Sequence, residues 1–389
     1  MKYTLDKETA KKFMLYKNGL IGPYKFTGKK GIVDYIRQVS VVQYDPVDVC
    51  GKSPEILLNS RVKGFKKPML HELLYKDRAL FDYHDKQMSI MLMSEWKYFD
   101  RTRRAFAERF PSKSDIAELS EYIYKVMEEK GEIASKDVPS SRKVDWFWAA
   151  TGAHRAVLEA LYLEGKIAIS NKSAAIKYYN FAEKVIPKEF YLMAEPHKLD
   201  IDHIKWRIKR RIGALGLLWN RPSDAFLGIK GLKAEERKRA FNEMENSGEI
   251  LPVYIEGIED AFYMLKEDEP VLEYTGSGRR LNLRCELLAP LDNFLWDRKL
   301  TEKLWGFKYK WEIYTPETKR QYGYYVLPVL YGMDFIGRIE LKRDTKEKVM
   351  IKKNFWPEAG VKLGKAKINA VEKAVKRLAV MNGVGYKHV

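Results

Sequence analysis

Two polar side chains stand close together in an otherwise apolar stretch near the start of the chain. The segment Val41–Pro46 reads Val-Val-Gln-Tyr-Asp-Pro, which predicts a short strand that ends at a proline. Because side chains of a strand alternate between its faces, Gln43 and Asp45 are expected to point one way and Tyr44 the other. An amide beside a carboxylate can hold and activate a water molecule. The alternative for Asp45 is a hydrogen-bonded turn before Pro46.

Hydrolysis of a glycosidic bond is a reaction that such a pair could catalyse. The bond breaks through an oxocarbenium-like state, which a carboxylate can stabilise while it also deprotonates the attacking water. One carboxylate is enough when the leaving group is already activated, as an N7-alkylated purine is, because that base is cationic and leaves without a proton. The Gln-x-Asp spacing alone does not decide between catalysis and the turn.

Composition favours a polyanionic partner. The chain has 389 residues, 46% of them hydrophobic, and a formal net charge of +18. Such a charge points to nucleic acid, with an anionic membrane surface or a generally Lys-rich proteome as alternatives. The start of the chain has no signal-peptide core, and no apolar run could span a membrane. Cys50 and Cys285 form no CxxC motif, so we expect a cytoplasmic location, no metal site and no disulfide framework.

Apolar periodicity predicts helices in the first third of the chain. Asp6 can cap a helix that places Ala10, Phe13 and Met14 on one face. Further helices are expected at Gly31–Gln38, across residues 68–110, and at Ile116–Lys130.

A helix followed by two strands occurs twice. The helix His154–Glu164 is followed by strands at Lys166–Ile169 and Ile176–Phe181, with a turn at Asn171–Ser173. A later segment has the same order, with elements predicted at Lys233–Asn246, Ile250–Ile255 and Ala261–Leu265. This order is typical of a winged helix, although a generic αβ unit also fits it.

The last part of the chain predicts a small antiparallel sheet or barrel. Strands are expected at Trp311–Tyr314, Tyr324–Tyr331 and Phe335–Lys342, and a closing amphipathic helix at Ala366–Val380. The predicted fold class is therefore α+β, with tandem winged-helix domains and a C-terminal small antiparallel β-barrel. The predicted domains are 1–110, which carries Gln-x-Asp, then 111–195, 196–270 and 271–389.

Basic side chains recur in every region, which indicates a long binding channel, although any single run is also typical of a solvated surface. The clusters are Arg61, Lys63, Lys66 and Lys67; Arg101, Arg103 and Arg104; Lys205, Arg207, Lys209, Arg210 and Arg211; Arg279, Arg280 and Arg284; and Lys319 and Arg320.

Two further polar clusters have competing interpretations. Asp82-Tyr83-His84-Asp85-Lys86 could act in acid–base chemistry, but a polar turn is the better reading. Asp292, close to Trp296-Asp297-Arg298, could be catalytic, but Asp–Arg pairs at this spacing more often brace a fold.

The chain resembles the AlkZ-like DNA glycosylases, and in particular their YcaQ branch, whose signature is Gln-apolar-Asp. The resemblance spans nearly the whole chain and is most specific near its C-terminus. The matching segments are Gln43–Asp45, Lys52–Pro54, Ser60–Val62, Leu288–Asp292, Leu295–Arg298, Glu312–Pro316, Lys319–Tyr324, Val326–Pro328 and Gly337-Arg338, with a looser match over Trp146–Pro187.

The resemblance implies three tandem winged-helix domains and a β-barrel around a basic DNA channel. It implies a monofunctional DNA glycosylase, without metal or cofactor, that releases N7-alkylated purines and unhooks DNA interstrand crosslinks. Gln43 and Asp45 would be catalytic. The side chains expected to contact DNA are Arg61, Lys63, Lys66, Lys67, His84, Lys86, Lys319 and Arg320. One departure stands out, because Tyr83-His84-Asp85-Lys86-Gln87 replaces Tyr-Trp-Ala-His-Glu of that branch.

The expected partner is double-stranded DNA with alkylated or crosslinked purines, bound by a monomer. The alternative is a winged-helix protein that binds double-stranded DNA, for example a regulator, without catalysis. A regulator would recognise base edges, whereas a repair enzyme would bind most sequences similarly. RNA binding is a third interpretation that the sequence leaves open.

Overall fold

The computed structural model describes residues 2–147 and 149–387, and its chain divides into two compact units. Unit 1 comprises Met1–Leu70, Asp85–Ser89 and Ile201–Val389, and unit 2 comprises His71–His84 and Ile90–Asp200. The short segment Asp85–Ser89 therefore belongs to unit 1 although both of its neighbours along the chain belong to unit 2. This division does not test the four predicted domains, which stay a prediction.

Short helices and strands of two or three residues make up the first part of unit 1, and the last of these helices ends in unit 2. In chain order the elements are β1 (Tyr3–Leu5), α1 (Lys7–Lys17), β2 (Phe26–Thr27), α2 (Gly28–Val39), β3 (Val42–Gln43), α3 (Ser53–Arg61), β4 (Val62–Lys63) and α4 (Lys67–Tyr75).

The first predicted helix is confirmed together with its cap. The Asp6 carboxylate accepts the Thr9 backbone N–H at 2.6 Å, and Ala10, Phe13 and Met14 of α1 are buried. The strand predicted after α2 is shorter than expected. It ends at Gln43, so the alternation of faces does not extend to Asp45.

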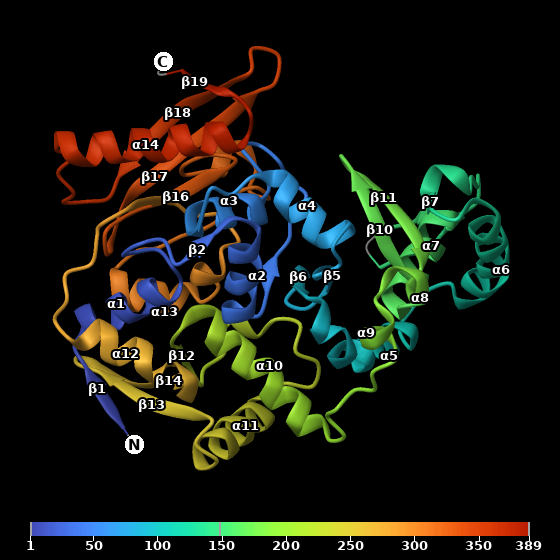
Figure 1. Ribbon diagram of the computed structural model, residues 1–389, viewed down its shortest axis with the longest axis horizontal. Helices are drawn as coiled ribbons and strands as arrows, with labels where there is room; N and C mark the ends of the chain where they lie inside the picture. The colour runs from blue at the N-terminus through green and yellow to red at the C-terminus, as the bar shows by residue number, and fades with distance from the viewer. Residues whose placement is uncertain (1, 148, 388–389) are drawn as a thin grey trace. The chain divides into compact units, whose positions relative to one another are not determined.

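Unit 2 contains a helical layer and a three-stranded sheet. Its elements are β5 (Leu80–His84), β6 (Met88–Leu92, of which Met88 and Ser89 belong to unit 1), the 3₁₀ helix η1 (Met93–Phe99), α5 (Asp100–Ala107), α6 (Lys113–Lys130), β7 (Ile133–Ala134), β8 (Lys143–Val144), β9 (Thr151–Gly152), α7 (Ala153–Glu164), β10 (Ile167–Ser173), β11 (Ile176–Phe181), α8 (Ala182–Val185) and α9 (Lys188–Tyr191). The sheet has the order β10-β11-β7, and the hairpin β10–β11 follows α7 as predicted (Figure 1).

Two predictions in this region are wrong. Residues 68–110 are not one helical stretch, because the strands β5 and β6 interrupt it. In a short buried apolar run, periodicity cannot distinguish a strand from a helix. The polar residues between β5 and β6 were the only sign of two separate strands. The turn predicted at Asn171–Ser173 lies within β10, where Lys172 pairs with Lys177 of β11.

After unit 2 the chain returns to unit 1 and completes a second sheet. The elements are α10 (Asp200–Leu215), β12 (Leu218–Trp219), α11 (Ala234–Asn246), β13 (Ile250–Ile255), β14 (Ile258–Leu265) and α12 (Glu269–Gly276). The sheet order is β1-β13-β14-β12, with β1 parallel to β13 and the other neighbours antiparallel. The predicted hairpin after α11 is thus confirmed.

The C-terminal sheet has five strands, and one long helix packs along it (Figure 1). The elements are β15 (Cys285–Leu287), α13 (Arg298–Trp305), β16 (Val326–Tyr331), β17 (Asp334–Asp344), β18 (Val349–Pro357), α14 (Lys365–Met381) and β19 (Gly385–Lys387). Neighbours are antiparallel except β18 and β19. Val371, Val375 and Leu378 of α14 are buried, whereas Ile368, predicted on the same stripe, is 46% exposed.

Two corrections concern this C-terminal region. The predicted small sheet is present, but it is open among the described residues, with β15 and β19 at its edges, and so it is a half-barrel and not a complete barrel. Packing against α14 buries apolar side chains of the sheet without closure. The predicted strand Trp311–Tyr314 is part of a loop, because the Glu312 carboxylate accepts backbone N–H groups of residues 321–323.

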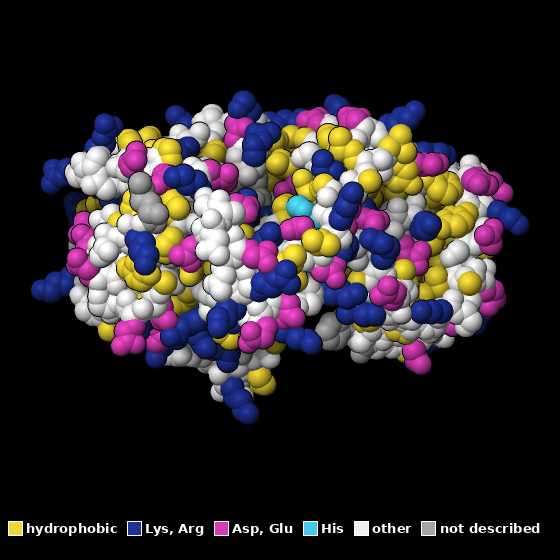
Figure 2. Space-filling model, turned by 90° about the horizontal axis from the view of Figure 1, so that it is seen from below, with side chains coloured by type: hydrophobic (Ala, Val, Ile, Leu, Met, Phe, Trp, Pro, Cys, Tyr) yellow, Lys and Arg dark blue, Asp and Glu magenta, His cyan; other side chains and the backbone are white. Residues whose placement is uncertain are grey.

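Basic side chains do not form one continuous patch on the face shown in Figure 2. Lys and Arg side chains alternate there with Asp and Glu, and apolar atoms lie between them. In the described part of the chain, no helix is long and apolar enough to cross a membrane. The same residues contain no group of three or more His, Cys, Asp or Glu that could hold a metal ion.

Candidate active site

The Gln-x-Asp segment lies at the end of β3, and its two polar side chains differ in environment. Gln43 is only 5% exposed, whereas Asp45 is partly exposed beyond the strand. The Asp45 Oδ1 accepts the Val47 backbone N–H at 2.9 Å, so the turn before Pro46 that we weighed as an alternative is present. Burial raises the pKa of the Asp45 carboxyl. The turn fixes one carboxylate oxygen and does not exclude a catalytic role for the other.

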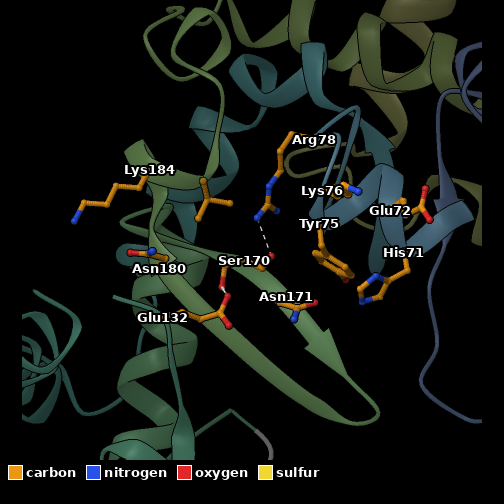
Figure 3. Close-up of a pocket in the computed structure, with 11 residues that line it drawn as sticks. His71, Glu72, Tyr75, Lys76, Arg78, Glu132, Ser170, Asn171, Asn180 and Lys184 are labelled. Atoms are coloured by element: carbon orange, nitrogen blue, oxygen red, sulfur yellow. Dashed lines mark hydrogen bonds between the residues drawn. The ribbon is translucent and has the colours of Figure 1, made fainter. Parts of the chain in front are cut away.

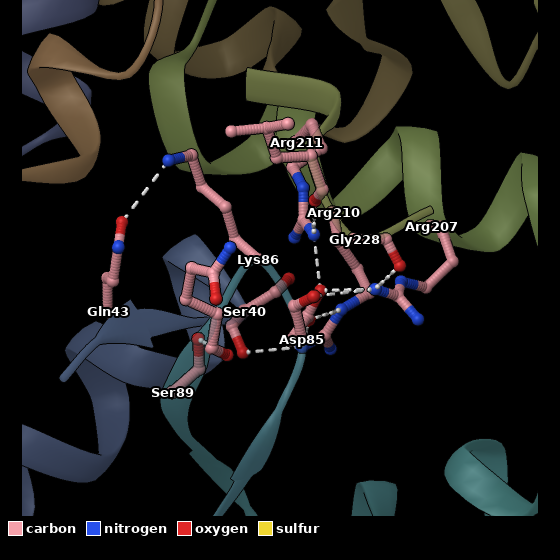
Figure 4. A network of polar contacts seen from close by, with 11 residues as sticks. Ser40, Gln43, Asp85, Lys86, Ser89, Arg207, Arg210, Arg211 and Gly228 are labelled. Carbon is pink, nitrogen blue, oxygen red and sulfur yellow. Dashed lines mark hydrogen bonds and ion pairs between the residues drawn. The ribbon is translucent and has the colours of Figure 1, made fainter. Parts of the chain in front are cut away.

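A lysine from a distant part of the sequence contacts the candidate amide. Lys86 Nζ donates to Gln43 Oε1 at 3.3 Å, and the lysine is 6% exposed (Figure 4). The ammonium also lies 5.2 Å from the ring centroid of Trp296. Lys86 takes one of the two lone pairs of the amide oxygen, and the Nε2 group of Gln43 has hydrogens that can be donated to a water molecule or a substrate.

The protonation of Lys86 is tuned by its surroundings. Burial, followed by the positive charges of Arg211 and Arg298, lowers the pKa of Lys86 to about 8, while Asp224 and Asp85 act in the opposite direction. The amine therefore loses its proton at a lower pH than an ordinary lysine does.

Asp85 anchors the turn that carries Lys86. Its buried carboxylate accepts from Arg207 at 2.7 Å, from Arg210 at 2.9 Å and from Arg211 (Figure 4). Burial alone would raise the pKa of Asp85, but the three guanidinium groups outweigh it and hold the pKa well below its ordinary value. We call Asp85 and these three arginines the Asp85 cluster.

The Asp85 cluster joins three segments of unit 1. Arg207 Nη2 also donates to the Gly228 carbonyl oxygen at 3.0 Å, and Arg210 Nη2 donates to the Ser40 carbonyl oxygen at 3.1 Å. Gly228 has a φ of +82°, and a Cβ added there would lie 1.9 Å from the Asp85 carbonyl oxygen. Only glycine fits at position 228, because the backbone there lies against the backbone of Asp85.

Sequence reasoning missed the role of the arginines in α10. We expected Arg207, Arg210 and Arg211 to neutralise phosphates, but all three are at least 97% buried on Asp85. Their spacing of three and four residues places them on one side of a helix. The sequence contained that signal, but it did not reveal that the facing partner was a carboxylate of the same chain.

Arg61 also differs from its predicted role. Its side chain is fully buried, and Nη2 donates to Asp292 Oδ1 at 2.7 Å. A guanidinium held in this way is not available to a phosphate, so the predicted DNA contact is withdrawn. Asp297 Oδ1 accepts the Leu300 backbone N–H at 2.8 Å and caps α13. Both acids therefore hold the fold together, Asp292 through the distant Arg61 and Asp297 through the cap of α13.

The remaining predicted DNA contacts fall into two groups. Lys63, Lys66 and Lys319 are exposed. Lys67 pairs with Glu55 at 2.8 Å, and Arg320 Nε donates to the Thr315 carbonyl oxygen at 2.9 Å. A contact with phosphate would have to compete with these internal partners.

His84 lies in unit 2, where its ring is 5.3 Å from that of Phe106. Burial, with a smaller effect of Lys177, lowers the pKa of His84 to about 4, so the ring is neutral at pH 7. The segment is a polar turn only in its second half. Asp82, Tyr83 and His84 belong to β5, whereas the Asp85 backbone N–H donates to the Gln87 carbonyl oxygen at 2.8 Å.

Comparison with known proteins decides what the chain is. A sequence model of the DNA glycosylase AlkZ-like family matches residues 36–381. The chain belongs to the AlkZ-like DNA glycosylase family. It is therefore a DNA glycosylase, and the non-enzymatic DNA-binding alternative is set aside. Among solved structures, the chain is similar to the DNA glycosylase AlkZ of Streptomyces sahachiroi, at 15% identity and a TM-score of 0.64, over 99% of this chain and 100% of that one. This second likeness supports the fold alone.

The glycosylase also has an open pocket of about 510 Å³ in unit 2 (Figure 3). Arg78 Nη2 donates there to the Ser170 carbonyl oxygen at 2.7 Å, and the Ser170 hydroxyl donates to Glu132. None of the residues predicted for catalysis or DNA contact lines this pocket. Its charged residues have both signs, so we do not include it in the candidate active site.

Replacing Asp85 tests the cluster directly. Asp85→Asn leaves three buried guanidinium groups without their carboxylate, and we expect a loss of about 3–5 kcal/mol in the free energy of unfolding at pH 7, measured with urea. Asp334→Asn is the matched control, because its pair with Lys11 is 70% exposed on the aspartate side and should contribute about 1 kcal/mol or less.

The loss of stability caused by Asp85→Asn should depend on pH. The folded-state pKa of Asp85 is depressed, so its stabilising effect is complete above the unfolded pKa of about 3.9 and is lost as the pH falls below it. The difference between wild type and Asp85→Asn should therefore shrink below about pH 4. A difference that stays constant down to pH 3 would contradict the assigned ion pairs.

Proposed function

We propose that this glycosylase hydrolyses the N-glycosidic bond of N7-alkylated purines in double-stranded DNA and unhooks interstrand crosslinks made by such bases. The observation that carries the proposal is the family match over residues 36–381, which includes Gln43-Tyr44-Asp45. The resemblance to the YcaQ branch supports the choice of lesion. We further propose that the enzyme is a monofunctional glycosylase that needs no metal or cofactor. It would act as a monomer in the cytoplasm.

In the proposed reaction, Asp45 is the general base and Gln43 orients the attacking water. Asp45 Oδ1 is held by the Val47 N–H, which leaves Oδ2 to accept a proton from the attacking water. The amide of Gln43, which Lys86 holds through its oxygen, orients that water. The water oxygen bonds to C1′, the C1′–N9 bond breaks, and its electron pair neutralises the cationic purine. The Asp45 carboxylate also stabilises the positive charge that develops on the sugar.

Binding of the duplex is assigned to exposed cations and to the helix–hairpin units. Lys63, Lys66 and Lys319 are the exposed members of the predicted set and would contact phosphates. The helix–hairpin order of α7–β10–β11 and of α11–β13–β14 supports winged-helix units. The tandem winged-helix arrangement and the domains 1–110, 111–195, 196–270 and 271–389 are part of this proposal.

Replacing Asp45 separates catalysis from binding. Asp45→Asn keeps the size of the side chain and an oxygen for the Val47 N–H, but removes the carboxylate charge and its basicity. We expect single-turnover release of N7-methylguanine from a labelled duplex to fall roughly 10²- to 10⁴-fold, while DNA affinity is unchanged.

Asp48→Asn is the control for Asp45→Asn. Asp48 lies three residues further on, pairs with Arg343 at 3.0 Å and should be replaceable without loss of excision. If Asp45→Asn releases the base as fast as wild type, the role assigned to Asp45 is wrong.

Replacing Lys86 tests how Gln43 is held. A charged donor makes a stronger hydrogen bond than a neutral one, so Lys86→Met should lower excision by roughly 10- to 100-fold at pH 7. Because the pKa of Lys86 is about 8, wild-type excision should fall as the pH rises through that value. Lys86→Arg keeps its charge over this range and should not show the fall.

Lys238→Met serves as the control for Lys86→Met, since Lys238 is exposed on α11. Excision that rises through pH 8, or that has the same pH profile in wild type and Lys86→Arg, would rule out the positioning role of the ammonium.

A further inference from the structure

The loop between residues 311 and 325 presents an aromatic side chain to solvent. Tyr314 is 85% exposed. No other large hydrophobic side chain in the described part of the chain is as exposed. Its ring has one aromatic neighbour, Trp311, at 6.1 Å between centroids and nearly edge to face. One face of the phenol ring is therefore accessible to a planar partner.

The loop is held rigidly although it has no strand. The Glu312 carboxylate is 94% buried and accepts the backbone N–H groups of Gln321, Tyr322 and Gly323 at 3.0, 2.8 and 3.4 Å. Burial alone would raise the pKa of Glu312, but these three donors lower it below the ordinary value.

Two further hydrogen bonds tie Thr315 into the same loop. Its backbone N–H donates to the Glu312 carbonyl oxygen at 2.9 Å, and its own carbonyl oxygen accepts from Arg320 Nε at 2.9 Å. Tyr314 is thus fixed between two anchored residues, so its exposure is built into the loop.

Basic residues lie on both sides of the exposed ring along the chain. Lys310 and Lys319 are exposed, and the Arg320 guanidinium lies 5.1 Å from the centroid of Tyr324, which is itself 40% exposed. Glu317 is the exposed acid of the loop. A tyrosine among cations matches the surface of nucleic acid, where phosphates lie beside planar bases.

The end of the loop connects it with the candidate active site within unit 1. The Tyr325 hydroxyl lies 3.5 Å from the Gly51 carbonyl oxygen. Burial raises the pKa of Tyr325, and the negative charges of Asp45 and Asp48 raise it further. The Tyr325 end of the loop therefore contacts Gly51, six residues after Asp45 in the sequence.

We propose that Tyr314 stacks on a base of double-stranded DNA next to the lesion and holds the duplex open there. A damaged or missing base weakens the local stack, so an aromatic side chain can enter at the lowest cost at that point. Lys310, Lys319 and Arg320 contact the phosphates on either side of the opened step. This inference rests on the proposed action on damaged DNA.

The test uses a duplex that needs no catalysis. The duplex carries one tetrahydrofuran abasic-site analogue with 2-aminopurine as the neighbouring base, and binding is followed by anisotropy and by 2-aminopurine fluorescence. Tyr314→Ala should bind roughly 5- to 150-fold more weakly than wild type and lose the change in 2-aminopurine fluorescence. Tyr314→Phe and Tyr314→Trp should retain both signals, because either ring can stack.

Tyr122→Ala is the matched control, since Tyr122 is a 49% exposed tyrosine on α6 of unit 2 and should behave as wild type. Wild-type affinity and fluorescence in Tyr314→Ala would overturn the inference, and so would a loss in Tyr314→Phe equal to that in Tyr314→Ala. A wild-type protein that shows the Tyr314-dependent signals but releases no base would overturn only the proposed function. Absence of DNA binding by wild type would overturn both.

Discussion

The candidate active site depends on one buried carboxylate. Asp85 binds three arginines of α10, and each of these groups has lost nearly all contact with water. Desolvation of four charges is costly, and the attraction among them offsets that cost only while the geometry is kept. Burial is the main cause of the low pKa of Lys86, and within the cluster Arg211 lowers that pKa further while Asp85 raises it. The cluster therefore fixes the place of the lysine that contacts Gln43.

This arrangement gives a physical meaning to the departure from the YcaQ pattern. Where that branch has Tyr-Trp-Ala-His-Glu, this chain has Asp85 to bind the arginines and Lys86 to hold the amide. The turn is thereby attached to unit 1, although the strands on both sides of it lie largely in unit 2. In the proposed reaction, the departure supports the orientation of Gln43, which the sequence alone could not show.

Sequence patterns within a few residues predicted helix caps and hairpins well, but they could not predict contacts between residues far apart in the sequence. The cap at Asp6 and the hairpin after α11 follow from patterns within a few residues. The pairing of Asp85 with Arg207 joins residues 122 positions apart, and nothing in either segment identifies the other as its partner. The same holds for Arg61 and Asp292, which are 231 positions apart. For this reason, arginines that pair with carboxylates of the same chain were expected to contact DNA.

The most direct measurement compares base excision in two glycine variants. Gly228→Ala would place a Cβ against the Asp85 carbonyl oxygen and displace the turn, whereas Gly231, also at positive φ, has open space around its Cβ position. With both variants folded and binding DNA, single-turnover release of N7-methylguanine should be slow in Gly228→Ala and near wild type in Gly231→Ala. Equal, wild-type rates in both would contradict a catalytic site held in place by the Asp85 cluster.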